Sequence, residues 1–433
     1  MAFGSKAAGA VQDRYHRLLK TAEDPHEWAY AWRTELNRGG FPAVRFIMDE
    51  IVNSGKCTGC AACVTICPTD VFGYADELPT EARPEACVQC VLCVDVCPVL
   101  RPADKDLPGL LKLHAPVIEE GFGPYSYGFY ARSTDPEIRA RAQDGGMVSE
   151  VLIHQMELGN LRGAILGDVD PANKQIGRQK LALTRQDVLA CAASRYTFSP
   201  NTLALQEARA QDVRPLAVVG VPCQVNGLRL QQHSSIRLEM ANWCRENVTL
   251  VIGLFCSEAF THESLEKLGE MLGVDPLRID NINIKGKVVV RLDTGEVVNV
   301  SLKKYREFAR AACLYCLDYG AEAADICGGG VGLDGWTLTL VRTEAGHKAL
   351  QAAIAAGRIE TRPLEDDPRG PHLLRTLAAN KKLNRPHPAL MPTLPERQAL
   401  GHVDPKTFYT TGPGAPPTAS DAGKAGADGK ATT

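Results

Sequence analysis

The chain has 433 residues, 45% of them hydrophobic, and a formal net charge of −3. Its length predicts two or three domains of about 100–200 residues each. The charge gives no reason to expect nucleic-acid binding, which needs a basic face, and no apolar run approaches the roughly 18 residues that cross a bilayer. The 15 cysteines, with no secretory signal before them, indicate a reducing, cytoplasmic setting in which thiols bind metal.

Residues 1–53 are expected to form a helical extension. Short apolar faces recur at helical spacing around Tyr15 to Leu19 and from Val44 to Val52, on either side of a Gly-Gly-Phe-Pro break. The simplest interpretation is a helical collar that packs on the next module, and a dedicated docking arm is the alternative. Nothing in this segment carries chemistry.

Residues 54–100 contain two copies of the spacing C-x-x-C-x-x-C-x-x-x-C-P. Bacterial two-cluster ferredoxins have this spacing, and the fourth cysteine of each run binds the other cluster. We therefore predict one 4Fe-4S cluster on Cys57, Cys60, Cys63 and Cys97, and a second on Cys87, Cys90, Cys93 and Cys67. A pair of zinc knuckles is the alternative, but zinc sites seldom combine a triple spacing with a trailing Cys-Pro. The sequence thus indicates a protein that moves single electrons.

Residues 101–127 are rich in proline and charge and are expected to form a linker. From 128 to 345, short apolar runs alternate with helical stretches, which predicts an α/β domain whose sheet is at least partly parallel. The expected strands are 163–167, 215–220 and 248–255, the expected helices are 148–158 and 201–209, and the expected β-hairpin is 288–300. Residues 346–385 have a mostly helical pattern, and 386–433 are expected to be a disordered tail.

Four further cysteines lie at positions that suit a ligand set in the α/β domain. Cys223 follows the expected strand 215–220, and Cys256 is at the end of the expected strand 248–255. Cys313 and Cys316 form a C-x-x-C. Ligands of open α/β sheets bind beyond the carboxyl ends of the strands. The four thiols therefore suit a third 4Fe-4S cluster. Cys223 and Cys256 can equally be small buried hydrophobic residues, and the spacing alone does not decide between the two.

Several glycine-rich, polar stretches of the same domain suit a phosphorylated cofactor. Helix starts favour phosphate and glycines allow close approach of a ligand, although each stretch taken singly is more often a turn. No G-x-G-x-x-G follows a strand, so a dinucleotide-binding Rossmann half is not supported. The stretches are 143–146, 194–197, 285–287 and 328–335.

Eight short motifs follow one another between about 128 and 385. They are Ala142–Gly146, Ser194–Tyr196, Val219–Gln224, Ile252–Cys256, Lys285–Lys287, Cys313–Asp318, Ala324–Ile326 and Asp334–Trp336. Their order and spacing resemble the β subunits of coenzyme F420-reducing hydrogenases and related dehydrogenases. With the double-cluster module in front, the layout most resembles the subunit that oxidises reduced F420 for methanogen-type respiratory complexes.

This resemblance implies an α/β domain that binds FAD and one 4Fe-4S cluster held by Cys223, Cys256, Cys313 and Cys316. It also implies that the flavin is surrounded by Gln143, Asp144, Gly145, Gly146, Ser194, Arg195, Tyr196, Thr197, Lys285, Lys287, Asp325 and Asp334. The chain departs from the family pattern at Cys327, where serine is common, and at Arg195, where lysine is common. The remaining thiols, Cys191, Cys244 and Cys327, are expected to be packing residues.

The expected fold is thus a ferredoxin module followed by an α/β domain, and the expected function is that of an iron–sulfur flavoprotein oxidoreductase subunit. It would pass electrons between a hydride carrier, F420 or NAD(P)H, at FAD and three 4Fe-4S clusters. The expected recipients are ferredoxin or a partner such as a 2-oxoacid oxidoreductase, hydrogenase, formate dehydrogenase or heterodisulfide-reductase-like complex. No residue is expected to be a dedicated proton donor. The alternatives are a ferredoxin-dependent reductase of its own organic substrate, similar to chlorophyll-pigment reductases, and a non-catalytic relay subunit.

Overall fold

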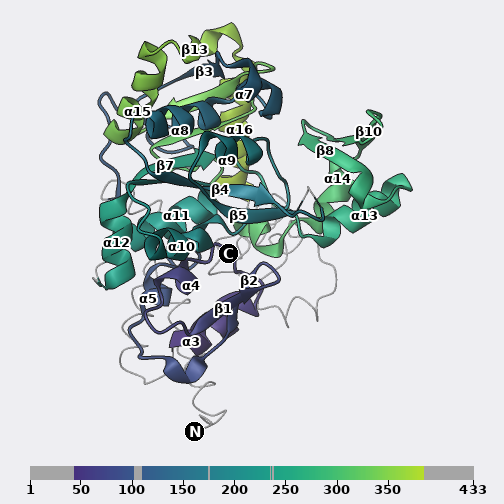
Figure 1. Cartoon of the computed structure of the whole chain (residues 1–433). Helices are drawn as coiled ribbons and strands as arrows, with labels where there is room; N and C mark the ends of the chain where they lie inside the picture. Colours follow the sequence, from purple (N-terminus) through teal and green to yellow (C-terminus); the bar gives the residue numbers. More distant parts are fainter. Residues whose placement is uncertain (1–42, 102–109, 174–175, 235, 237, 385–433) are drawn as a thin grey trace, which may run out of the picture.

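The computed structural model describes residues 43–101, 110–173, 176–234, 236 and 238–384. These residues form a small cysteine-rich module, a large α/β domain and a lobe that stands out from that domain (Figure 1). The helices expected before residue 43 and the tail expected after residue 385 lie outside the described residues.

The cysteine-rich module consists of two similar halves around one antiparallel hairpin. In each half a short helix starts just after the second cysteine of the motif, where Ala61 and Val91 adopt left-handed φ angles of 59° and 55°. The sharp turn places the third cysteine of each motif in the first turn of its helix. The elements are α3 (Ala43–Phe46), η1 (Ile47–Val52), α4 (Ala62–Ile66), β1 (Phe72–Ala75), β2 (Leu78–Glu81), η2 (Pro84–Ala86) and α5 (Leu92–Asp95).

The predicted amphipathic stretch before the first motif is confirmed as α3 and the π-helical turns of η1. Its apolar side chains, among them Phe46 and Ile51, are buried in one core with residues from both cysteine motifs, such as Val64 and Val94. This core encloses the module on the side away from the α/β domain.

The α/β domain is built on a mixed sheet of eight strands in the order β13-β3-β12-β11-β7-β6-β4-β5. The inner strands β11, β7, β6 and β4 run parallel, and the other pairs are antiparallel. All three predicted strands are present. The bounds are β3 (Tyr127–Ser133), β4 (Gly163–Val169), β5 (Gly177–Ala182), β6 (Leu216–Gly220), β7 (Val248–Leu254), β11 (Ile326–Gly329), β12 (Thr337–Val341) and β13 (Ile359–Arg362).

Helices cover both faces of this sheet. One face packs on α8 (Met147–Glu157), α9 (Arg185–Ala190) and α15 (Glu344–Ala355), with α7 (Pro136–Arg141) at its edge. The other face packs on α10 (Ala204–Ala210), α11 (Pro222–Gln232), α12 (Glu239–Asn247) and α16 (Arg369–Asn384), with η3 (Asn201–Leu203) before α10. Helices α4 and α5 of the cysteine-rich module share this second core, so the module is packed against the helices below the sheet (Figure 1).

Polar contacts fix the module on the α/β domain. The Thr65 hydroxyl donates to the side-chain oxygen of Gln231 at 3.2 Å, and the Ser234 hydroxyl donates to the Asp95 carboxylate at 2.7 Å. The Thr202 hydroxyl donates to the backbone carbonyl of Cys60, a residue of the first motif. The cysteine-bearing loop is therefore held directly by the α/β domain.

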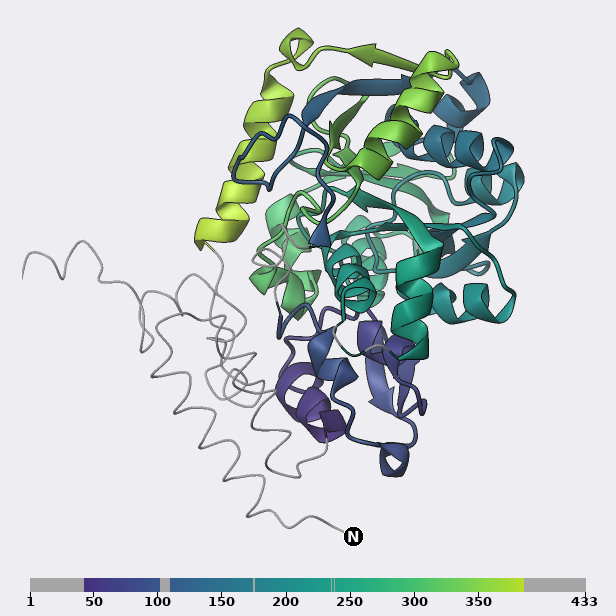
Figure 2. The same ribbon diagram turned by 90° about the vertical axis from the view of Figure 1, so that its left-hand side faces the viewer.

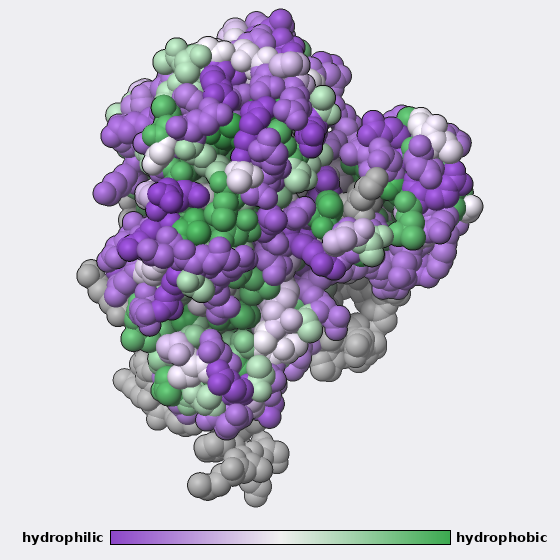
Figure 3. Space-filling model, viewed as in Figure 1, coloured by the Kyte–Doolittle hydropathy of each residue, from purple (hydrophilic) through white to green (hydrophobic). Residues whose placement is uncertain are grey.

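The lobe consists of a three-stranded antiparallel sheet, the amphipathic helix α13 and several shorter helical turns (Figure 1). The space-filling view shows the same lobe standing out from the α/β domain (Figure 3). It contains the predicted hairpin, to which the structure adds β8 as a third strand. The elements are α13 (Glu263–Leu272), η4 (Pro276–Arg278), β8 (Ile279–Ile284), β9 (Val288–Leu292), β10 (Val297–Val300), α14 (Leu302–Tyr305), η5 (Arg306–Phe308) and η6 (Ala311–Tyr315).

The C-terminal segment contains a strand as well as the expected helices. Between α15 and α16, β13 pairs with β3 at the edge of the large sheet and is followed by η7 (Leu364–Asp366). Part of the expected linker is also packed on this domain, because the buried Arg342 donates to the carbonyls of Pro124 at 2.6 Å and Phe122 at 2.9 Å. None of the helices in the described ranges has the length and apolar character that a bilayer crossing needs.

Candidate functional site

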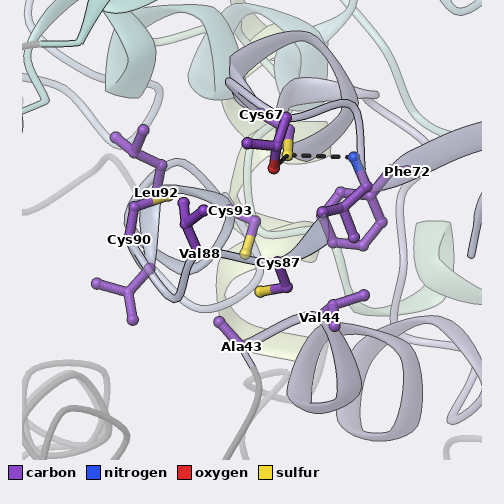
Figure 4. Close-up of a pocket in the computed structure, with 12 residues that line it drawn as sticks. Ala43, Val44, Cys67, Phe72, Cys87, Val88, Cys90, Leu92 and Cys93 are labelled. Carbon is purple, nitrogen blue, oxygen red and sulfur yellow. Dashed lines mark hydrogen bonds between the residues drawn. The ribbon is translucent and has the colours of Figure 1, made fainter. Parts of the chain in front are cut away.

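Two hollows in the cysteine-rich module are each lined by four cysteines. One is lined by Cys57, Cys60, Cys63 and Cys97, and the other by Cys67, Cys87, Cys90 and Cys93. Each hollow thus takes three cysteines from one motif and the fourth from the other motif (Figure 4). The remaining walls are mostly apolar, with Ile47 and Val99 at the first and Phe72 and Leu92 at the second.

The surroundings of these thiols suit a group that binds thiolates. Burial raises the pKa of Cys57 to about 12, with the neighbouring Cys60 acting in the same direction. When a metal coordinates the sulfur of such a thiol, it displaces the proton, which is released. Backbone N–H groups also point at the sulfurs, from Gly59 to Cys57 Sγ and from Val71 to Cys67 Sγ, both at 3.4 Å. Two hollows with four thiols each fit 4Fe-4S clusters.

Among the described residues, no three His, Cys, Asp or Glu side chains are placed to hold a single metal ion. The thiols instead line the two hollows, as the four cysteines labelled in Figure 4 do.

A third group of cysteines gathers at the carboxyl edge of the parallel strands. Cys223 lies in the first turn of α11 after β6, Cys256 follows β7, and Cys313 and Cys316 lie in and just after η6. Burial raises the pKa of Cys223 well above its usual value, and Cys60, Cys316, Cys313 and Cys256 add to this in that order. Four mutually close thiols from three separate segments fit one further 4Fe-4S cluster.

This third group lies next to the first hollow of the cysteine-rich module. Gly227, one turn after Cys223 on α11, is so close that a Cβ there would lie 3.2 Å from Cys60 Sγ. Residues four apart on a helix are neighbours, at roughly 5–6 Å between Cβ atoms. Of the cysteines that act on the Cys223 thiol, Cys60 has the largest effect. The first hollow is thus the one that faces the α/β domain.

Arg310 spans the same boundary, although no sequence motif marks it. Its guanidinium donates to the Glu77 carbonyl at 3.0 Å and lies 4.0 Å from the centre of the Phe198 ring. Its charge lowers the pKa of both Cys57 and Cys313, against the larger effect of burial. A buried cation therefore stands between the first hollow and the third cysteine group.

Polar side chains of the lobe and of the α/β domain meet at the same sheet edge, and this group of residues is called the polar cleft below. Lys285, in the β8–β9 turn, pairs with Asp334 at 2.7 Å and with Asp144 at 3.8 Å. Asp144 lies directly over Gly330, where a Cβ would clash with its carboxylate. Burial raises the pKa of Asp144, and the Lys285 charge opposes this effect. Three segments that are distant in sequence thus meet at one cleft.

The stretch 194–197 joins this cleft. The Ser194 N–H donates to the side-chain oxygen of Gln143 at 3.3 Å, and the Ile284 N–H donates to the Tyr196 hydroxyl at 3.1 Å. Thr197 is buried, and its hydroxyl accepts from the Gly177 N–H at 3.2 Å. Arg195 has a buried Nε with no hydrogen-bond partner among the described residues. An unsatisfied buried donor marks a place where a polar ligand fits.

Glycines bring the backbone close together beside this stretch. Gly146 has a φ of 77° and directly precedes α8, whose start faces the cleft side of the sheet. A Cβ on Gly145 would clash with the Ala131 carbonyl oxygen, so a side chain there is excluded. The start of α8 therefore offers a helix terminus suited to phosphate.

Aromatic side chains lie between the polar cleft and the third cysteine group. Burial raises the pKa of Tyr196, and the charges of both Asp144 and Cys256 act in the same direction, so Tyr196 lies near both. Phe255 and Tyr319 stack with their ring centres 5.8 Å apart. These rings make an apolar wall that connects the two sites.

One of the predicted cofactor contacts, Asp325, lies apart from the cleft. Asp325 directly precedes β11, whereas Asp144 lies over Gly330, which directly follows β11. The two aspartates are therefore at opposite ends of this strand, which rises roughly 3.3 Å per residue. The Asp325 carboxylate pairs with Arg229 at 2.7 Å and accepts the Val251 N–H at 2.7 Å. The Lys287 side chain is exposed.

The remaining three cysteines stand outside these groups. Cys244 and Cys327 are fully buried within apolar cores, as expected of packing residues. Cys191 is half-buried at the end of α9, and burial raises its pKa to about 12.

Three family models match the chain. Two of them describe the beta subunit of coenzyme F420 hydrogenase/dehydrogenase: the model of its N-terminal part matches residues 128–206, and the model of its C-terminal part matches residues 213–367. The third, "4Fe-4S dicluster domain", matches residues 56–101, which contain both cysteine motifs.

Similar proteins include subunits of enzymes named for coenzyme F420. The coenzyme F420 hydrogenase beta subunit of Methanothermobacter thermautotrophicus is 35% identical over 60% of this chain and 92% of its own length. A subunit of the F(420)H(2) dehydrogenase of Methanosarcina mazei is 30% identical over 77% of this chain and 91% of its own length. Among solved structures, a chain of the F420-reducing [NiFe] hydrogenase complex from Methanosarcina barkeri matches with a TM-score of 0.57 and 33% identity, over 61% of this chain and 92% of that one.

Proposed function

Because the chain belongs to the family of coenzyme F420 hydrogenase/dehydrogenase beta subunits and carries a 4Fe-4S dicluster domain in front of the family match, we propose that it is the flavin-bearing electron-transfer subunit of an F420-linked oxidoreductase. In this proposal the polar cleft binds FAD, the third cysteine group binds one 4Fe-4S cluster and the ferredoxin module binds two. A bound flavin would exchange a hydride with its carrier and exchange single electrons with iron–sulfur clusters.

The observation that carries this proposal is the position of α11. Its Cys223 end belongs to the third cysteine group, and one turn later Gly227 lies against Cys60. The aromatic wall of Tyr196, Phe255 and Tyr319 lies beside Cys256 of the same cysteine group. The chain thus arranges its sites in the order cleft, third group, first hollow, second hollow.

The residues of the cleft are suited to holding FAD. Lys285 and Arg195, whose Nε has no hydrogen-bond partner within the described part of the chain, offer positive charge to phosphates, and the start of α8 after Gly146 adds backbone donors. Asp144 positions the Lys285 ammonium, which also ties the lobe to the α/β domain. The lobe is therefore held to the α/β domain beside the residues proposed to bind FAD.

The second hollow is suited to an exit towards a partner. Cys87 and Cys90 are half-buried, and Val88 between them has 61% of its surface exposed. In the proposed order of sites, which starts at the cleft, the second hollow comes last. A partner that docks over Val88 would receive or supply electrons there, and the relatives' names point to a hydrogenase-type partner.

The carrier favoured by the comparisons is coenzyme F420. The relatives at 30–35% identity are named for this coenzyme. By contrast, a 7-hydroxymethyl chlorophyll a reductase from rice, the kind of protein behind the organic-substrate alternative, is 24% identical over 60% of this chain. The relay alternative, in which the flavin site is vestigial, predicts that the isolated protein binds no FAD.

Iron and flavin analysis of the wild type, Cys256→Ala and Cys244→Ala tests the proposal. Cys256→Ala should lose one cluster's worth of iron relative to the anaerobically reconstituted wild type and keep FAD. Cys244→Ala is the matched control, because that thiol is buried in the apolar core away from the three groups. Iron content that is equal in all three proteins, or wild-type protein without FAD, would contradict the proposal.

A further inference from the structure

Lys381, on helix α16, lies beside the third cysteine group. This helix is outside the residues that the family models match. The match ends at residue 367, and α16 begins at Arg369. Figure 2 shows α16 along the side of the α/β domain. Near its end, the Lys381 ammonium donates to Cys316 Sγ at 3.4 Å and to the Asp318 carbonyl at 2.9 Å. Only 3% of Lys381 is exposed.

The helix is held firmly enough to keep this ammonium in place. Leu374 and Ala378 are buried in the core below the sheet. Arg375 makes two hydrogen bonds to Glu120, at 2.5 and 3.0 Å, and Lys382 pairs with the buried Glu322 at 2.7 Å. Burial of a lysine is costly unless its charge is compensated. The Lys381 charge also acts on the Asp318 carboxylate, where it opposes the effect of burial on the pKa.

The lysine acts on more than one thiol. Burial raises the pKa of Cys256 to about 12, and the Lys381 charge is the largest influence in the opposite direction. It also opposes the effect of burial on the pKa of Cys313. Three of the four thiols therefore lie within range of one buried positive charge.

We propose that Lys381 is a positioning residue that sets the reduction potential of the third cluster above the value it would have without this charge. The inference rests on the proposed function, since it requires a cluster on Cys223, Cys256, Cys313 and Cys316. In one-electron reduction the cluster gains one negative charge, supplied by the flavin, and no bond forms or breaks. A fixed cation and an N–H···S hydrogen bond stabilise the more negative state, because net charge and hydrogen bonds to sulfur set cluster potentials.

The test is a redox titration followed by EPR on the full-length, reconstituted protein. Lys381→Gln keeps a hydrogen-bonding side chain without the charge, and should make the third cluster at least tenfold harder to reduce, about 59 mV for one electron. Lys381→Arg keeps the charge and should restore most of the shift. Lys348→Gln, the control that removes the charge of a 73% exposed lysine on α15, should leave the midpoint unchanged. The signal that is lost in Cys316→Ala identifies the third cluster.

An unshifted third-cluster midpoint in Lys381→Gln would overturn the role of Lys381 while leaving the proposed function intact. If no signal is lost in Cys316→Ala, the third cluster itself, and with it the proposed function, is wrong. If Lys381→Gln loses the cluster's iron, retention in Lys381→Arg supports the charge as the cause. Loss of that iron in both variants would show that the lysine only packs the helix, and would overturn the inference.

Discussion

Replacing Asp325 by asparagine separates a structural role from a cofactor role. The Asp325 carboxylate is 6% exposed and pairs with the 8% exposed Arg229 at 2.7 Å. It also accepts the Thr343 hydroxyl at 2.7 Å. Removing one partner of a buried ion pair costs about 3–5 kcal/mol, because the other charge stays buried without compensation. We expect Asp325→Asn to lower the free energy of unfolding of the α/β domain by this amount.

Urea unfolding followed by tryptophan fluorescence measures this loss. With a slope of roughly 3 kcal/mol per molar urea, the midpoint should fall by about 1 M or more, while bound FAD per folded protein stays at the wild-type level. Asp144→Asn is the control. Its partner Lys285 is 41% exposed and lies 3.8 Å away, so its loss should cost at most about 1 kcal/mol, but it should weaken FAD binding. An unchanged midpoint together with lost FAD in Asp325→Asn would refute this reasoning.

Three other predictions test the order of the sites. Cys313→Ala should leave FAD reducible by its two-electron donor but block electron transfer to an iron–sulfur acceptor. Unimpaired electron transfer in a stopped-flow assay would contradict the proposed route. Gly227→Leu should force α11 away from Cys60 and lower the free energy of unfolding in urea by about 1–3 kcal/mol. It should also weaken the EPR interaction between the first and third clusters. An unaltered EPR spectrum would contradict the adjacency of these two clusters. Lys285→Met should weaken FAD binding by about 10–100-fold in a fluorescence titration. Lys287→Met should have a smaller effect, because within the described residues its side chain has no ion pair like those of Lys285 with Asp144 and Asp334. Equal effects of the two substitutions would count against the Lys285 contact.

The spacing of the cysteine motifs was enough to predict how the module is built. A three-cysteine loop with a trailing Cys-Pro constrains the backbone locally, and the structure repeats that local turn at Ala61 and Val91. The inner strands were equally predictable, because continuous apolar runs such as Leu216–Gly220 are buried on both faces. Signals of this kind depend on a few neighbouring residues.

Features that depend on distant contacts could not be predicted. Lys381 reaches Cys316 across 65 residues of sequence, and nothing in its own helix indicates this. The short strand β13 has mostly exposed side chains apart from Ile359, so it lacks the apolar pattern of an inner strand. Asp325 stands in a motif that resembles a family signature, but a signature does not tell whether an aspartate serves a cofactor or an internal ion pair.

The most direct test of the central claim is an anaerobic absorbance experiment on the reconstituted wild-type protein. Reduced coenzyme F420, NADH, NADPH or reduced ferredoxin is added separately, and the bleaching of flavin and of the clusters is followed in time. The account predicts that reduced coenzyme F420 bleaches the flavin first and the clusters after it. Bleaching by reduced ferredoxin alone, with no response to any hydride carrier, would contradict the claim and favour a reductase with its own organic substrate.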